Sequence, residues 1–474
     1  MDFKGMLIDK IRLYDGSKGY LLMRGGLSQG DYPETWNLAR PDAVYEIHKA
    51  YAEAGAEVLQ TNTLQSSGFH LEAVGLYEKL REINRAGVLL AKRAADGKAL
   101  VAASVGPLGR LMEPYGDLSF DSAFSVFSEY VGALIDGGTD LLHFETFTDL
   151  SELRAAILAA RSLDPSIPIV ATLSLERGGR TVAGDDAACS SLALDMLRVE
   201  CVGANCGLPP AQMLSVFEPF SIAGLPLCAK PNAGLPVLSD GGAMYGSDEE
   251  EFYGAAFGFG SMGARLLGGC CGSGPSHIKR LKNAVDEMNA DKKYAYAPLS
   301  GGQYKKEGGT VRVCSYDHYT DINIEKMVKS LKRFQKAANT ENVKGKPIFY
   351  ADALSDDDII AVDLSSLRAD KATLNDAAVD ILAELSDSDA GASVICLNAG
   401  PEMSREAAKA VFSSIAVNAR TYHKNPLLFQ TNEPEALESA LSRYCGAAAA
   451  VADAGSVDSL RRVTDKYRVE IIGI

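Results

Sequence analysis

Three cysteines with glycine neighbours are the residues of this chain whose types and spacing point most directly to chemistry. Two of them are adjacent in the run Gly268-Gly269-Cys270-Cys271-Gly272, and the third lies in Gly203-Ala204-Asn205-Cys206-Gly207. Each run follows a short apolar stretch, so we expect the three sulfurs to converge where two strands end. Three thiolates around an open fourth position describe a zinc site that holds an exchangeable ligand.

The adjacent pair poses a geometric problem, because successive residues on a regular strand point to opposite faces. The flanking glycines 268, 269 and 272 allow unusual backbone angles at the strand end, and we expect them to let both sulfurs reach one ion. Two alternatives without catalytic use stay open, a closed zinc site and three unrelated buried cysteines. A disulfide between Cys270 and Cys271 is a further alternative, which a reducing compartment disfavours.

A site of this kind suits the transfer of an alkyl group to sulfur. A thiol in the fourth position is held as thiolate at neutral pH, where a free thiol with a pKa of about 8.5 is mostly protonated. Three protein thiolates give the ion much negative charge, which keeps the bound sulfur nucleophilic and weakens the Lewis acidity of the ion toward water. We therefore predict alkyl transfer to a small thiol rather than hydrolysis.

The elements that must position these residues are indicated by apolar periodicity. Eight strand-like runs occur before residue 272, most of them followed by a segment with the spacing of an amphipathic helix. Eight such units in about 280 residues predict a (β/α)8 barrel, in which the strand C-termini form the active face. An open doubly wound sheet is the alternative, but no G-x-G-x-x-G turn follows a strand. The runs are Ile11–Asp15, Glu57–Thr63, Leu100–Val105, Leu141–Thr146, Ile169–Leu175, Val202–Cys206, Leu225–Lys230 and Ala264–Gly269, and the helical segments include Asp42–Ala54, Leu71–Ala95, Asp121–Gly137 and Ser151–Leu163.

Polar residues follow these strands and are candidates for holding a substrate. If the thiol belongs to an amino acid, Asp15 and Glu145 are suited to its ammonium group. The N–H groups around Gly16 and the side chains of Thr61 and Asn62 are suited to its carboxylate. For each residue taken singly, a helix cap or a loop contact is the alternative. The candidate substrate-binding set is Asp15, Gly16, Thr61, Asn62, Ser104, Glu145 and Asn232.

A second region follows a segment without apolar periodicity. We place the barrel at residues 1–293, a linker at 294–309 and a smaller α/β domain at 310–474. Strand-like runs separated mostly by helical segments predict a largely parallel sheet there. The last run has no helix after it, so we expect an exposed sheet edge that offers a docking surface. The strand runs are Val311–Tyr316, Pro347–Tyr350, Ile359–Leu364, Ser393–Leu397, Pro426–Gln430, Ala447–Ala452 and Val469–Ile474, and the helices include Ile324–Ala338, Asn375–Leu385, Ser404–Ala419 and Pro434–Tyr444.

Composition narrows the class of protein. The 474 residues are 47% hydrophobic and 23% charged, as in ordinary globular chains. The net charge of −15 argues against nucleic-acid partners and anionic membranes, which favour basic patches. No apolar stretch reaches the roughly 18 residues of a membrane span, and we expect no signal peptide. Nine cysteines fit a reducing cytoplasm better than a disulfide framework. Six of them are interpreted as apolar filler: Cys189, Cys201, Cys228, Cys314, Cys396 and Cys445.

Ordered motifs between about residues 8 and 290 resemble the zinc-dependent homocysteine S-methyltransferases, a family that includes betaine–homocysteine methyltransferase and the N-terminal module of cobalamin-dependent methionine synthase. The motifs are Asp15-Gly16, Glu34-Thr35-Trp36-Asn37-Leu38 with Pro41, Ala54-Gly55-Ala56-Glu57, Thr61-Asn62-Thr63, Gly106-Pro107, Glu145-Thr146, Lys230-Pro231-Asn232-Ala233-Gly234 and the two cysteine runs. The resemblance implies a (β/α)8 barrel and an enzyme that methylates homocysteine to give methionine.

The resemblance also implies roles for individual residues. Zinc would lie on Cys206, Cys270 and Cys271, with homocysteine as the fourth ligand. The amino group of homocysteine would lie near Asp15 and Glu145, and Asn232 would lie close to the metal, filling the open position before substrate arrives. Two departures bear on which thiol is accepted: Gly19-Tyr20 stands where the family has Gly-Thr, and Leu64 stands where it has phenylalanine.

The second region resembles a truncated pterin-binding domain. Segments 395–400 and 426–441 are similar to parts of the pterin-binding barrel of methionine synthase, but the region is shorter than a whole such barrel. We find no cobalamin-binding histidine motif. We therefore expect a methyl donor such as methylcobalamin on a separate corrinoid protein, methyltetrahydrofolate or a small onium compound. The alternatives are a zinc-dependent thiol-binding or scaffold module without transfer activity, and a methyltransferase for another small thiol or selenol.

Overall fold

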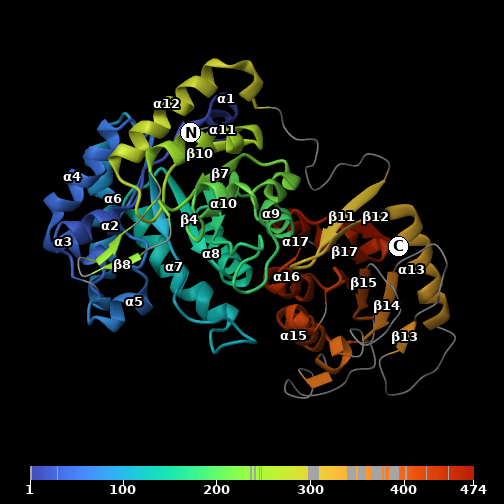
Figure 1. The fold of residues 1–474 in the computed structure, drawn as a ribbon. Coiled ribbons are helices and arrows are strands. Elements are labelled where there is room, and N and C mark those ends of the chain that lie inside the picture. Colours follow the sequence, from blue (N-terminus) through green and yellow to red (C-terminus); the bar gives the residue numbers. More distant parts are fainter. Residues whose placement is uncertain are drawn as a thin grey trace. The chain divides into compact units, whose positions relative to one another are not determined.

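The structure is a computed structural model, and the chain divides by its internal contacts into two units (Figure 1). The first contains Met1–Met112, Leu118–Ala187 and Val199–Gly301, and the second contains Glu113–Asp117, Ala188–Arg198 and Gly302–Ile474. The predicted linker lies mostly outside the described residues, so the boundary at residue 293 stays a prediction. The structure describes residues 3–28, 30–234, 237–239, 242–244, 246, 248–296, 309–338, 348–350, 359–364, 376–377, 379–383, 394–400, 403–422, 424–446 and 448–474.

Eight parallel strands of the first unit form a barrel, as predicted. Strand neighbours follow chain order, and the last strand pairs with the first. A parallel bridge between Tyr14 and Val58 joins β1 to β2, so the sheet closes on itself. The strands are β1 (Arg12–Leu13), β2 (Val58–Gln60), β3 (Leu100–Val105), β4 (Leu141–Phe147), β5 (Ile169–Leu173), β6 (Cys201–Asn205), β7 (Leu227–Lys230) and β10 (Ala264–Leu267).

Helices connect these strands. Their starts follow local chemistry: Pro41 occupies the first turn of α4, and the side chains of Ser119 and Asp149 accept hydrogen bonds from the first turns of α7 and α8. Between β6 and β7 the connection is short, with α10 (Pro210–Leu214) and the 3-10 helix Glu218–Ala223. The longer helices are α4 (Pro41–Glu53), α6 (Leu80–Ala95), α7 (Phe120–Asp136), α8 (Leu150–Leu163), α9 (Ala187–Met196), α11 (Glu249–Ser261) and α12 (Pro275–Ala290).

One predicted helix of the barrel is wrong in its extent. The segment Leu71–Ala95 is not continuous: α5 (Gly68–Ala73) ends, a short 3-10 turn follows at Tyr77–Lys79, and only then does α6 begin. Gly75 lies between them with a φ of +70°, a left-handed conformation that terminates a helix. The hairpin β8 (Val237–Ser239) and β9 (Gly242–Met244), and the helices α1 (Phe3–Asp9) and α2 (Lys18–Arg24), are also absent from the prediction.

Apolar side chains fill one end of the barrel. Phe3 and Leu7 of α1 pack against a cluster that includes Tyr14, Cys201 and Cys228. All six cysteines interpreted as filler are buried, which confirms that they behave as small apolar residues. Because this cluster joins α1 to the beginnings of the strands, the polar residues that follow the strands are left at the opposite end.

The second unit contains a six-stranded sheet in chain order, β13 (Ile348–Tyr350), β14 (Ile359–Asp363), β15 (Val394–Asn398), β16 (Leu427–Gln430), β17 (Ala449–Ala452) and β18 (Ile471–Gly473). Only β13 runs antiparallel to its neighbour, so the largely parallel sheet is confirmed. The final strand β18 lies at one end of the sheet order. The predicted helix Asn375–Leu385 lies partly outside the described residues.

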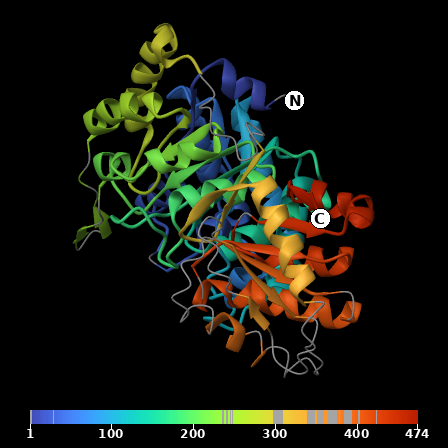
Figure 2. The same ribbon diagram turned by 90° about the vertical axis from the view of Figure 1, so that its right-hand side faces the viewer.

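Helices cover both faces of this sheet. Leu428 of β16 packs against Val311 and Met327, from the hairpin and helix that precede the sheet, and Figure 2 shows this helix lying along the strands. Its neighbour Phe429 contacts Phe412 on the other face, with ring centroids 5.3 Å apart. The hairpin strand β12 was not predicted, because only Ile322 of its side chains is buried. The covering elements are β11 (Thr310–Cys314), β12 (Tyr319–Asn323), α13 (Ile324–Ala338), α15 (Arg405–Tyr422), α16 (Pro434–Arg443) and α17 (Val457–Lys466).

The helices were also searched for membrane spans. Among the residues that the structure describes, none of the helices is both long and apolar enough to cross a bilayer.

Candidate metal and substrate site

The three cysteines predicted as metal ligands meet where β6 and β10 end. Their sulfur atoms lie within 4.8 Å of one another, and Cys206 Sγ is 3.7 Å from Cys271 Sγ. Tetrahedral zinc with Zn–S bonds of about 2.3 Å places its sulfur ligands about 3.8 Å apart, so the spacing fits this ion. All three residues are partly exposed, which leaves the cluster open to a further ligand.

Backbone hydrogen bonds hold the cluster in place. Cys206 N donates to Lys230 O at 3.1 Å, and Cys270 N donates to Pro231 O at 2.8 Å. The Asn232 side chain accepts a hydrogen bond from Cys271 N at 3.1 Å. The segment that follows β7 therefore ties the two cysteine motifs together.

The glycines near the cysteines act differently from the prediction. Among Gly268, Gly269 and Gly272, only Gly272 has a left-handed φ, of +78°. The expectation of unusual backbone angles is therefore wrong for the other two, which are required by close packing. A Cβ on Gly269 would lie 2.2 Å from Ser273 Oγ, and one on Gly268 would lie 2.6 Å from Tyr14 Cβ. The second left-handed residue of the site is Cys206 itself, with a φ of +60°.

The three thiols do not hold their protons equally. Hydrogen bonds from Cys270 and Cys271 to the sulfur of Cys206 lower the pKa of Cys206 well below its usual value. The same bonds raise the pKa of Cys270 and Cys271. Cys206 is therefore the first of the three to become a thiolate, and a soft cation would complete the deprotonation of the cluster.

A chain of buried hydrogen bonds supports the sulfurs from the barrel interior. Asn205 Nδ2 lies 3.6 Å from Cys270 Sγ, and Asn205 Oδ1 accepts from Thr172 Oγ1 at 2.6 Å. Since Thr172 donates its proton there, His143 donates from Nε2 to Thr172 Oγ1, and His143 Nδ1 accepts from Gln60 Nε2, both at 2.9 Å. Burial lowers the pKa of His143 to about 3, so this imidazole stays neutral and fixes the network.

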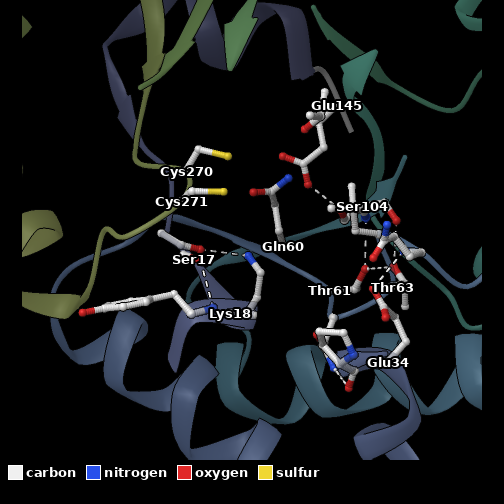
Figure 3. A pocket seen from close by; sticks show the side chains of 18 of the residues that line it. Ser17, Lys18, Glu34, Gln60, Thr61, Thr63, Ser104, Glu145, Cys270 and Cys271 are labelled. Carbon is white, nitrogen blue, oxygen red and sulfur yellow. Dashed lines mark hydrogen bonds between the residues drawn. The ribbon is translucent and has the colours of Figure 1, made fainter. Parts of the chain in front are cut away.

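A cavity of about 220 Å³ opens beside the cysteines. Five of the predicted substrate residues line it: Gly16, Thr61, Asn62, Ser104 and Glu145, together with Cys270 and Cys271. Figure 3 shows the sulfurs of these two cysteines pointing into the space, with Glu145, Ser104 and Thr61 across from them. The other two predicted residues lie behind the lining: Asp15 is fully buried, and Asn232 contacts the backbone of Cys271.

Glu145 is held as a buried carboxylate. It accepts a short hydrogen bond from Ser104 Oγ, and its Oε2 lies 3.6 Å from Lys230 Nζ. Burial by itself would raise the pKa of Glu145, but Lys230, His143 and Lys18 together lower it to about 2. The side chain therefore carries its negative charge throughout the neutral range.

Asp15 is paired with a residue that the sequence analysis missed. Lys18 Nζ lies 3.2 Å and 3.1 Å from the two carboxylate oxygens of Asp15 and 3.1 Å from Gly16 O. The backbone N–H of Gln60 donates to the same carboxylate at 2.8 Å. A lysine three residues after an aspartate in a glycine-rich turn is the signal that points to this pair. Lys18 lines the cavity, whereas Asp15 does not.

The side chains of Thr61 and Asn62 are engaged in the wall of the cavity. Thr61 Oγ1 accepts from Ser104 N at 3.0 Å and pairs with Thr63 Oγ1 at 2.5 Å. Asn62 Nδ2 donates to Pro33 O at 2.8 Å and to Asn37 Oδ1 at 3.0 Å. Both residues therefore shape the wall by bonds to the protein itself.

Glu34 is a further cavity residue without a predicted role. Its Oε1 accepts from Gln65 N at 2.8 Å, and within the described part of the chain its buried Oε2 has no hydrogen-bond partner. Burial raises the pKa of Glu34 to about 7, although the Gln65 N–H opposes the change. Its recognition needs the tertiary structure, because the motif that contains it follows a turn remote from the cysteines.

The fold and this site define a closed (β/α)8 barrel protein with a three-cysteine centre at one end of the barrel. The chain belongs to the homocysteine S-methyltransferase family, whose model matches residues 12–285. This assignment agrees with the resemblance drawn from the sequence motifs.

Methionine synthases are among its relatives. The chain is 32% identical over 306 residues to the enzyme of Mycobacterium leprae, covering 61% of this chain and 25% of the relative. It is 31% identical over 322 residues to the enzyme of Mycobacterium tuberculosis, covering 64% and 27%. The chain therefore spans about a quarter of the length of these relatives.

Solved structures with the same fold include the homocysteine methyltransferase MmuM from Escherichia coli. Its oxidized form is 24% identical with a TM-score of 0.51, covering 58% of this chain and 95% of that chain. Its metallated form is 24% identical with a TM-score of 0.50, covering 58% and 96%. At this level of identity the likeness supports the fold of the barrel.

Proposed function

We propose that this protein is a zinc-dependent methyltransferase that methylates homocysteine to give methionine. The observation that carries the proposal is the group of three sulfurs, within 4.8 Å of one another, at the edge of a polar cavity. Family membership supports homocysteine as the acceptor. Reduced thiols are needed for such a site, so we propose that the protein works in the cytoplasm.

Cys206, Cys270 and Cys271 are the proposed zinc ligands. Bound zinc would supply a positive charge that keeps the acceptor sulfur deprotonated at neutral pH. Asn205 would orient Cys270 through its amide, and Asn232 would orient Cys271 through its backbone N–H. Partners of this kind outside the ligand set usually tune the geometry and affinity of metal sites.

The cavity is the proposed binding site of the acceptor. Gly16, Thr61, Asn62, Ser104 and Glu145 would surround it, while Asp15 and Asn232 would act from behind the wall. Holding a thiol and a methyl donor in line replaces a bimolecular encounter with an oriented one, which is the main catalytic task of such a site. The same enclosure limits the access of water to the reacting sulfur.

The methyl donor is proposed to be methylcobalamin on a separate corrinoid protein, or methyltetrahydrofolate. This part of the proposal draws on the methionine synthase relatives, of which the chain spans about a quarter. The smaller domain is proposed to be a truncated pterin-binding domain that binds the donor or docks its carrier. Its terminal strand β18, at the end of the sheet order, is the proposed docking edge.

The test is a methyl-transfer assay with each donor in turn. Zinc-loaded protein is incubated with homocysteine and methylcobalamin, methyltetrahydrofolate or an onium compound, and methionine is measured. We expect product with one donor and none with Cys206→Ser, while Cys396→Ala, which removes a buried thiol of the second sheet, stays active. Thiol binding at the metal without product under any donor would support the thiol-binding module instead.

A further inference from the structure

Two lysine ammonium groups face the cavity in which the proposed acceptor must lie. Lys18 and Lys230 both line it, together with Glu145. Their side chains are 11% and 2% exposed. Such deep burial of two cations beside one small cavity calls for an explanation, because an ammonium group loses its hydration there.

Lys18 occupies the place where a substrate ammonium group would meet Asp15. Its Nζ contacts both carboxylate oxygens, at 3.2 Å and 3.1 Å, and it stands between Asp15 and the cavity, since it is a lining residue and Asp15 is not. One of those oxygens also accepts the Gln60 N–H. The Asp15 carboxylate is therefore already neutralised by a cation of the protein.

Lys230 has a different arrangement, with donors still to be used. Its Nζ lies 3.6 Å from Glu145 Oε2, beyond hydrogen-bond length, and 4.8 Å from the centre of the Tyr14 ring. Over the described ranges of the chain, no hydrogen bond is made by this ammonium group. A buried cation with free N–H groups beside a polar cavity is suited to an anionic group of a ligand.

We infer that Lys18 and Lys230 make the carboxylate, and not the ammonium group, the part of the acceptor that this cavity selects. Asp15 and Glu145 then serve to hold the two lysines in position. The inference rests on the proposed function, because it concerns the acceptor of that same site. It reverses the roles that the family resemblance implies for Asp15 and Glu145.

The charges decide between the two arrangements. Two carboxylates and two lysines cancel before any substrate enters, so an incoming ammonium group would be a third cation beside two neutralised anions. An incoming carboxylate would instead find the unused donors of Lys230. At the short distances of a buried site, such charge contacts outweigh the small difference in shape between the two groups.

Two truncated thiols separate these cases. 4-Mercaptobutanoate is homocysteine without its amino group, and 3-aminopropane-1-thiol is homocysteine without its carboxylate. Their dissociation constants from the zinc-loaded full chain are measured by calorimetry beside that of homocysteine. We expect loss of the amino group to change the constant by less than about tenfold, and loss of the carboxylate to weaken binding on the order of 100-fold.

Variants assign the preference to the lysine. Lys18→Met should reduce the discrimination between the two truncated thiols by about tenfold or more. Because this change leaves Asp15 buried without its partner, the neutral double variant Asp15→Asn with Lys18→Met should reduce the discrimination in the same way. Lys49→Met, which alters an exposed lysine of α4, should leave all three constants unchanged.

The opposite order of affinities would overturn the inference. If 3-aminopropane-1-thiol binds more tightly than 4-mercaptobutanoate while homocysteine binds well, the acceptor is selected by its ammonium group and only this inference fails. An unchanged preference in both Lys18 variants would also overturn the part assigned to Lys18. If none of the thiols binds to the zinc-loaded protein, the proposed function fails together with it.

Discussion

Asn205 Nδ2 lies 3.6 Å from Cys270 Sγ, although the two residues belong to different cysteine motifs at the ends of β6 and β10. The same side chain is fixed by Thr146, whose hydroxyl and backbone N–H both lie 2.7 Å from it. Thr172 donates to its Oδ1 at 2.6 Å. The residue next to Cys206 therefore holds the second cysteine in place, so the two motifs are mechanically linked.

This relationship predicts that Asn205→Ala weakens metal binding without removing a proposed ligand. Loss of a partner that orients a metal ligand typically costs about 10- to 100-fold in affinity. The zinc dissociation constant is measured by competition with a chromogenic chelator. Asn418→Ala removes another buried amide, which bonds to Ser414 O at 2.9 Å in the second unit, and should leave the constant unchanged. Equal affinity in Asn205→Ala and the unaltered protein would contradict the argument.

The sequence was sufficient for the parts of the molecule that depend on local patterns. Apolar runs with period-two or helical spacing indicate each barrel strand, because a parallel strand is buried on both faces. The glycine-flanked cysteines likewise form a local motif, and Cys206 does meet Cys270 and Cys271. Helix ends were less predictable, since the break after α5 depends on the backbone angle of one residue, Gly75.

The charge pairs of the cavity were beyond the sequence analysis. Lys230 and Glu145 are 85 positions apart (230 − 145) yet lie 3.6 Å from each other, a contact that only barrel closure creates. Lys18 is close to Asp15 in the chain, but a lysine in a turn is usually solvated, and its burial follows from the surrounding wall. The left-handed backbone of Cys206 is unpredictable for the same reason, because non-glycine residues adopt it only under tertiary constraint.

Close packing beneath the metal site predicts that Gly203→Ala is strongly destabilising. A Cβ at this position of β6 would lie 1.9 Å from Cys228 O, a backbone atom that can move only with its strand. We expect a loss of about 3 kcal/mol or more in the free energy of unfolding, measured by denaturant titration. The control is Gly254→Ala, in α11, where nothing lies within 4 Å of the added carbon. That variant should be slightly more stable, by about 0.5–1 kcal/mol.

The lowered pKa of Glu145, about 2, predicts a stability loss in acid. A carboxyl whose folded pKa lies below its unfolded value of about 4.5 stabilises the fold above that value, and the contribution disappears as the pH falls from about 4.5 to 2. Glu145→Gln leaves the Lys230 ammonium buried without its partner, so it should cost about 3–5 kcal/mol at neutral pH. The difference from the unaltered protein should shrink near pH 3.

The measurement is a pair of denaturant titrations for each protein, one at neutral pH and one in acid. Glu218→Gln changes an exposed carboxylate outside the cavity and should follow the unaltered protein at both values. A cost of Glu145→Gln that stays constant or grows on acidification would show that the carboxylate is not stabilised by the neighbouring cations.

Glu152 of α8 predicts the opposite dependence on pH. Its Oε1 accepts from Leu108 N at 2.6 Å, but burial raises the pKa of this carboxyl to about 8, with a smaller effect of Asp149 in the same direction. A raised folded pKa means that the folded state keeps a proton which the unfolded state loses. The stabilising contribution is therefore complete below about pH 4.5 and declines as the pH rises toward 8.

Glu152→Gln should remove this decline, because the amide stays neutral and its oxygen still accepts from Leu108 N. We expect the variant to match the unaltered protein near pH 4.5 and to exceed it above pH 8 by an amount on the order of a few kcal/mol. Denaturant titrations across this range provide the measurement, and Glu72→Gln, at an exposed position of α5, controls for the change of net charge. A variant less stable than the unaltered protein in alkali would mean that Glu152 is ionised in the fold and bound by a cation.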